Sequence, residues 1–265
     1  MSFRRIRILL LLGVLALTLG LTSLERYLVR AWRAPLDVVV YPVNGDGSEA
    51  SAEYIRALRP ENFAAIDAFL EREARRYGVK LSPAMTLTLE PEIHEAPPAP
   101  PHDRSVVQTI LWSLKLRWWV YRHSGQVLPQ LGKIRLYVLF HEAHEGRMLD
   151  HSLGLQKGLV GVVHVFASDS MASRNQAVIA HELLHTLGAT DKYDPATNQP
   201  LFPDGYAEPA REPLHPQNEA EIMAGRIPLA DDRAVMPRSL DQSVIGAATA
   251  HEINFGGGFA SQYSH

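Results

Sequence analysis

The segment from His181 to Asp191 places the strongest constraint on how this chain folds. His181 and His185 are four residues apart, so in an α-helix their imidazoles project from one face. Gly188 follows where a left-handed residue commonly ends a helix. The pattern predicts a helix over residues 174 to 187 whose opposite face is anchored in the core by apolar residues, namely Ala177, Ala180, Leu183, Leu184 and Leu187.

The start of this helix is also marked. Ser173 and Gln176 are spaced as a capping box, in which the serine oxygen accepts from a free amide of the first turn. The Gln176 side chain would reach back to the Ser173 amide. The box therefore predicts that the helix begins at Arg174.

The residues around the two histidines complete the pattern of a metal centre. Their spacing suits two ligands on one tetrahedral zinc ion, which also needs a third protein ligand and an open position. Glu182 lies about 100° round the helix from His181, where it can reach a water on the metal without binding the metal. A turn at Gly188 can bring Asp191 back towards the histidines. We therefore expect Zn²⁺ held by His181, His185 and Asp191, with Glu182 as the general base.

The pattern H-E-x-x-H-x-x-G-x-x-D resembles the zinc signature of the metzincin metalloproteases, with Asp191 in place of their usual third histidine. That family has a Met-turn beneath the metal, and Met223 lies at a comparable distance downstream, with Met236 as a weaker candidate. The resemblance implies peptide-bond hydrolysis by a zincin-like α+β fold. This fold has a mixed β-sheet with an antiparallel edge strand, a central active-site helix, the Met-turn and a C-terminal helix. Residues 158–166 would form the edge strand, and residues 241–253 the last helix.

Several alternatives stay open. The third ligand is a downstream glutamate in gluzincins, and the candidates here are Glu208, Glu219 and Glu221. An aspzincin-like arrangement would use the second acid of Gly-x-x-Asp-x-x-Asp, which is Asp194. A tyrosine common after the metzincin Met-turn is missing, which leaves Tyr193, Tyr206 and Arg226 as candidates to stabilise the oxyanion. A non-catalytic zinc-binding scaffold is a further alternative, although it would not need Glu182.

The N-terminus predicts a membrane segment. Basic residues precede an uncharged apolar run from Ile8 to about Ser23, the pattern of a secretory signal or signal anchor. No clean cleavage site follows, so we favour an anchor over a cleaved, secreted form, with the catalytic domain in the periplasm or outside the cell. The expected division is a cytoplasmic N-terminus (1–7), a transmembrane helix (8–24), a juxtamembrane linker (25–35) and a zinc metalloprotease domain (36–265).

The remaining segments alternate between strands and helices, as in an α+β domain. Strands are expected at 36–41, 85–89 and 134–140, and a helix at 62–77. A second helix is expected from about Asp103 to Arg122. From Trp112 onwards it carries four aromatic and three basic residues, which are Trp112, Trp118, Trp119, Tyr121, Lys115, Arg117 and Arg122. Aromatics at helical spacing favour a core helix with a cationic solvated edge, and the alternative is a face that contacts a membrane or substrate.

Composition narrows the ligands and partners. The chain has no cysteine, so any metal must be held by His, Asp or Glu. Its formal net charge of −3 gives no reason to expect nucleic acid, and the expected partners are a peptide or protein substrate and the membrane. The cluster from His141 to Glu145 offers a second possible metal site, but a solvated loop is favoured.

Overall fold

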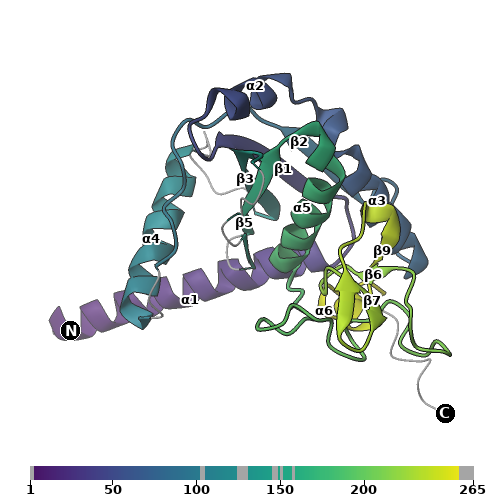
Figure 1. Ribbon diagram of the computed structural model, residues 1–265. Helices are drawn as coiled ribbons and strands as arrows, with labels where there is room; N and C mark the ends of the chain where they lie inside the picture. The colour runs from purple at the N-terminus through teal and green to yellow at the C-terminus, as the bar shows by residue number, and fades with distance from the viewer. Residues whose placement is uncertain are drawn as a thin grey trace, which may run out of the picture.

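The computed structural model describes residues 3–101, 105–123, 131–144, 149, 152–156 and 159–256. Its centre is a five-stranded sheet in the order β2-β1-β3-β5-β4 (Figure 1). Four strands run parallel, and the edge strand β4 is antiparallel to β5. The strands are β1 (Leu36–Asn44), β2 (Met85–Leu89), β3 (Lys133–Glu142), β4 (Leu153–Leu155) and β5 (Val160–Ala167).

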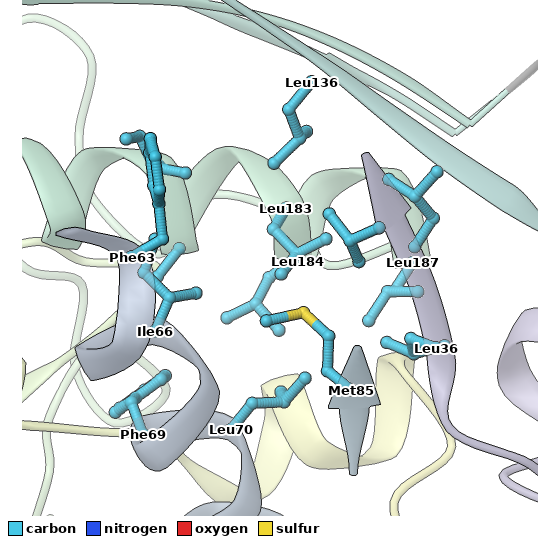
Figure 2. Packing of buried hydrophobic residues seen from close by; sticks show 14 of the residues in the cluster. Leu36, Phe63, Ile66, Phe69, Leu70, Met85, Leu136, Leu183, Leu184 and Leu187 are labelled. Carbon is cyan, nitrogen blue, oxygen red and sulfur yellow. The ribbon is translucent and has the colours of Figure 1, made fainter. Parts of the chain in front are cut away.

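Helices cover both faces of this sheet. One face packs in a large apolar cluster against α2 (Glu49–Ala57), α3 (Ala64–Arg76) and α5 (Ala172–Leu187). In Figure 2, Leu183, Leu184 and Leu187 of α5 point among side chains of β1, β2, β3 and α3. The opposite face packs against α4 (Val106–His123) through a smaller cluster. Burial on both faces explains why the parallel strands read as nearly continuous apolar runs.

The first helix, α1 (Phe3–Arg30), reaches from the N-terminus to the domain (Figure 1). It is long and apolar enough to cross a membrane, and none of its apolar window is buried in the protein. It contains the predicted span and continues through half of the expected 25–35 linker. Its end is fixed to the domain, because Val29 is buried in the large cluster and the Trp32 indole, just beyond the helix, donates to the carbonyl of Ile253 at 2.9 Å.

The chain after α5 forms short elements around the end of that helix. Two parallel strands, β6 (Ala220–Glu221) and β9 (Ser243–Val244), make one small sheet, and β7 (Ile227–Ala230) and β8 (Arg233–Val235) make another. The last helix is α6 (Ala247–Glu252). Three 3-10 turns complete the described elements, namely η1 (Pro60–Phe63), η2 (Asp169–Met171) and η3 (Leu240–Gln242).

The predictions for the first three strands are confirmed, as are the helix at 62–77 in its main part and the α+β class. The prediction that residues 158–166 form the antiparallel edge strand is wrong. That segment, described from residue 159, is the parallel strand β5, and the edge is β4. The helix predicted at 241–253 is shorter, because residues 243–244 pair as β9 and only Ala247–Glu252 is helical.

Two further predictions are wrong. The helix α5 begins at Ala172 after η2, so Ser173 is inside it and caps nothing; the Gln176 amide instead donates to the Asn62 carbonyl at 2.7 Å. The helix α4, whose predicted start at residue 103 lies outside the described residues, is not a core helix. It buries only Leu116 and Trp119 among its residues.

Candidate metal centre

The helix α5 holds both histidines on a rigid support. Its apolar residues are buried in the large cluster, with Leu183, Leu184 and Leu187 each at most 1% exposed. Gly188 ends the helix with a φ of 105°, a left-handed conformation that costs glycine little. The chain therefore turns back at this point, and Asp191 returns to the histidines as the sequence predicts.

Three ligand atoms converge at the end of α5. The Nε2 atoms of His181 and His185 are 3.0 Å apart. Asp191 Oδ1 lies 3.1 Å from each of them. The carboxylate of Glu182 belongs to the same group, since its ligand atom and those of the two histidines all lie within 4.8 Å of one another. This cluster has the donor types and the spacing to hold a metal ion.

The outer nitrogens of both rings fix which side faces the cluster. His181 Nδ1 donates to the Ile222 carbonyl at 3.0 Å, and His185 Nδ1 donates to the Ala189 carbonyl at 2.8 Å. In the neutral rings, each Nε2 is then a lone-pair acceptor. Two such acceptors and a carboxylate oxygen within about 3 Å repel one another unless a cation lies between them. The arrangement therefore fits a metal, whose histidine ligands usually make such outer hydrogen bonds.

Charge and burial shift the pKa values of this group. Burial would raise the pKa of Asp191, but the adjacent imidazoles of His181 and His185 hold it far below its ordinary value. Burial would lower the pKa of His185, but the nearby Asp191 carboxylate and the hydrogen bond to the Ala189 carbonyl raise it. The Asp191 carboxylate is therefore ionised and already oriented towards the two rings.

Glu182 differs from Asp191 in its surroundings. Its side chain is buried, and burial raises its pKa against the lowering effect of His181 and His185. Its Oε2 is buried without a hydrogen-bond partner among the described residues. A buried carboxylate oxygen without a partner is costly, so this atom fits a site where it meets a ligand or a water.

The edge strand β4 lies directly against the histidine helix, a contact that the sequence did not predict. A Cβ at Gly154 would collide with His185 Cβ and with the carbonyl of Glu182. The Gly154 amide lies close enough to the Glu182 carboxylate to favour its charged form. Glycine is therefore required at this position of β4. The only sequence signal was a glycine inside a short apolar run, Leu153-Gly154-Leu155.

The predicted Met-turn residue lies in a tight turn beside His181. Met223 is fully buried, and the preceding carbonyl of Ile222 accepts from His181. The Glu221 carboxylate ties this turn to the N-terminal part of α6. It accepts from the amides of Met223, Ala224 and Gly246 and from the Thr249 hydroxyl, at 2.6–3.1 Å. Met236, the weaker candidate, is half exposed.

A buried lysine fixes the loop that carries Asp191. Lys192 Nζ donates to the Thr190 carbonyl at 2.9 Å and pairs with Glu252 at 2.8 Å. Its own amide donates to the Met223 carbonyl at 3.0 Å. The loop is thus joined both to the Met223 turn and to α6. The sequence shows Lys192 next to Asp191 but gives no sign that its side chain is buried.

The rival third ligands lie elsewhere. The Glu221 carboxylate already accepts the four hydrogen bonds described above, and Glu208 pairs with Arg211 at 3.0 Å. Asp194 accepts from the Ala196 amide within its own turn at 2.7 Å. For Glu219, the described residues provide no ion pair with either histidine.

Of the three residues considered for the oxyanion, Tyr193 is nearest to the cluster. Burial raises its pKa, and the charges of Asp191 and Glu182 raise it further, so its phenol keeps its proton. The Tyr206 hydroxyl instead faces His215 Nε2 at 3.2 Å, away from the cluster. Within the described part of the chain, the ion pairs of Asp191 are with His181 and His185 and not with Arg226.

No protein-family model matches this chain, and no curated protein matches it. Among solved structures, wild-type OgpA from Akkermansia muciniphila matches with a TM-score of 0.31 and 16% identity, over 60% of this chain and 50% of that one. Catalytically inactive OgpA in complex with an O-glycopeptide substrate, glycodrosocin, matches with a TM-score of 0.32 and 13% identity, over 62% and 51%. This chain spans about half the length of those chains. Similarity this low assigns no function to this chain.

Proposed function

We propose that this chain is a membrane-anchored, extracytoplasmic, zinc-dependent endopeptidase. The observation that carries the proposal is the convergence of His181 Nε2, His185 Nε2 and Asp191 Oδ1 at 3.0–3.1 Å, beside the buried carboxylate of Glu182. For zinc–nitrogen bonds of about 2.0–2.1 Å, tetrahedral ligands lie ~3.3 Å apart. The donor set and the spacing therefore suit zinc, with Asp191 as the third ligand.

Bound zinc would supply Lewis-acid polarisation of the scissile carbonyl and would lower the pKa of the attacking water. Glu182 takes the proton from this water and later delivers it to the leaving amine, so the carboxylate is regenerated in each cycle. Burial raises the pKa of Glu182, which suits a group that must both accept and release a proton. The protonated Tyr193 phenol is our candidate donor to the developing oxyanion.

The surroundings of the cluster suit an extended peptide. The short edge strand β4 lies against Glu182 and His185 and leaves one backbone edge free of pairing within the described sheet. A peptide can add to such an edge through main-chain hydrogen bonds. A mainly apolar cavity of about 180 Å³ next to His181, lined by Val178, Ile222 and Met236, offers room for one side chain of that peptide.

The proposal is tested with the zinc-loaded full chain and a mixture of unstructured peptides. We expect cleavage within the peptides, and Glu182→Gln should lower the rate about 10²–10⁴-fold while zinc stays bound. Glu219→Gln is the matched control, because that glutamate contacts neither histidine, and it should keep the parental rate. Full activity in Glu182→Gln would contradict the mechanism, and zinc binding without any cleavage by the parent would favour the scaffold alternative.

A further inference from the structure

The helix α4 presents a second apolar face that the protein does not cover. Six apolar side chains along it are between 54% and 65% exposed, namely Val107, Ile110, Leu111, Leu114, Trp118 and Tyr121. At about 100° per residue these positions form one continuous stripe. We call these six residues the outer stripe. Exposed apolar patches of this extent on a soluble protein mark a contact with another surface.

The outer stripe lies opposite the face that packs on the sheet. Leu116 and Trp119 are buried against β3 and β5, and the Trp119 ring meets Tyr137 at 4.7 Å between centroids. One face of α4 therefore suffices to attach the helix to the domain. The other face must be stabilised by a partner, since a helix that is apolar on both sides is normally covered on both.

The charges on α4 favour an anionic lipid surface as this partner. The described helix contains no Asp or Glu, and Lys115, Arg117 and Arg122 are exposed beside the outer stripe. On the helical wheel, Lys115 and Arg122 border one side of the stripe and Arg117 the other. Trp118 and Tyr121, within the stripe, are the aromatic types enriched at membrane interfaces. A helix with this distribution lies in the interface with basic side chains among the headgroups.

The position of α4 relative to α1 supports the same partner. Arg117 lies close enough to Glu25, near the end of α1, for their charges to interact. In the view of Figure 1, the N-terminal half of α1 extends from the body on the side where α4 lies. If α1 crosses the membrane, the segment around Glu25 leaves the bilayer next to α4. The outer stripe is then held at the membrane surface.

We propose that α4 is a second membrane contact, which inserts the outer stripe into the interface of an anionic leaflet and holds the catalytic domain against it. This inference uses the proposed membrane span of α1 but not the peptidase activity. The partner is the lipid surface itself, rather than a second copy of the chain or another protein. Together with α1, whose end is fixed to the domain, this contact sets how the domain lies on the membrane.

The chain has no cysteine, so single cysteines can carry a nitroxide label at chosen positions. We would reconstitute the full chain in vesicles of phosphatidylcholine and phosphatidylglycerol and compare label accessibility to oxygen and to a water-soluble nickel chelate. Leu114→Cys and Trp118→Cys probe the outer stripe. Glu53→Cys, exposed on α2 across the sheet, is the aqueous control, and Leu12→Cys reports insertion of α1.

We expect severalfold higher oxygen-to-nickel ratios at positions 114 and 118 than at position 53. Adding Lys115→Glu and Arg122→Glu should lower the ratio at both stripe positions. Aqueous ratios at 114 and 118, with a lipid ratio at 12, would overturn the proposal while leaving the α1 anchor intact. Dipolar broadening between two copies labelled at 118 would also overturn it, in favour of a dimer. An unchanged ratio in the charge variant would contradict the role of anionic headgroups.

Discussion

Two pairs of histidines in this protein hold ring nitrogens close together, but in different ways. His181 and His185 approach Nε2 to Nε2 at 3.0 Å, with their rings nearly perpendicular. His141 and His164, on neighbouring strands, approach Nε2 to Nδ1 at 2.9 Å, with their rings stacked. The second contact fits an ordinary hydrogen bond in which one ring donates and the other accepts.

The first contact does not fit such a bond, because both outer nitrogens already donate to carbonyls of Ile222 and Ala189. Asp191 adds a third acceptor to the first pair. The comparison teaches that the backbone carbonyls behind the rings, rather than the distance between two histidines, distinguish a metal centre from a hydrogen-bonded pair.

The largest expected effect is the loss of zinc when a ligand of the first histidine pair is removed, and it distinguishes the two pairs directly. His185→Ala removes one of three ligands and should abolish stoichiometric zinc binding and all peptide cleavage. His164→Ala removes the ring that contacts His141 and should keep zinc and activity. Metal content by mass spectrometry and cleavage rates measure both. Loss of zinc in His164→Ala would show that the second pair also holds metal and would break the comparison.

A smaller effect is expected where the edge strand meets the histidine helix. Gly154→Ala places a methyl group against the backbone of Glu182 and must displace β4 or α5, which we expect to lower activity about 100-fold. Gly161→Ala is the matched control, because Gly161 pairs with Gly154 but its added methyl would lie against side-chain ends, of which Leu136 is the nearest, rather than against backbone. Equal rates in the two variants would mean that the β4 contact does not position the site.

The buried lysine behind the first pair should matter less. Lys192→Met keeps the length of the side chain but removes its bonds to Thr190 and Glu252, so the loop carrying Asp191 loses support. We expect zinc affinity to fall about 10-fold, as for other outer partners of metal ligands. Competition with a zinc chelator measures this change. Parental affinity would show that the turn at Gly188 alone positions Asp191.

The smallest expected effect changes the stability of the fold but not the zinc content, so it distinguishes unfolding from loss of the metal. Burial raises the pKa of Asp67 from 3.8 to about 6, so the folded state binds a proton more tightly than the unfolded state, and the free energy of unfolding falls as the pH rises through this range. Asp67→Asn cannot ionise and should stabilise the protein by about 1 kcal/mol near pH 7.5, a value reduced because the residue is partly exposed to solvent.

Below about pH 3, Asp67 is mostly protonated in both states, so the gain in Asp67→Asn should vanish. Denaturant titrations at the two pH values test this. Zinc content should not change, because Asp67 on α3 is not among the ligand groups. A gain at both pH values would assign the effect to packing rather than to ionisation.

Local spacing in the sequence was enough to predict the helix of the site and its end at Gly188. These features depend on residues within one or two turns of each other. The helical spacing of the apolar residues in α5 also indicates which face of the helix is buried. The parallel strands were also predictable, because β1 and β3 are apolar almost throughout. The proximity of Asp191 to the histidines followed from the same local turn.

The features that the sequence did not predict depend on contacts between segments that are distant in the chain. Gly154 and Glu252 approach the site from β4 and α6, and no local pattern connects them with residues 181–191. The edge strand was misassigned because β4 is only three residues long, whereas β5 carries the stronger strand pattern. The aromatic residues of α4 led to the prediction of a core helix. The helix has two apolar faces, and its composition does not show which of them packs against the rest of the protein.

The central claim is that three side chains of this protein hold one zinc ion. Its most direct test is the zinc content of the purified full chain, measured by mass spectrometry beside Asp191→Ala, which removes the ligand that distinguishes the first histidine pair from the second. The account predicts one zinc per chain in the parent and strongly reduced zinc in the variant. Full zinc in Asp191→Ala would move the third ligand elsewhere, and a parent that takes up no zinc after reconstitution would contradict the account.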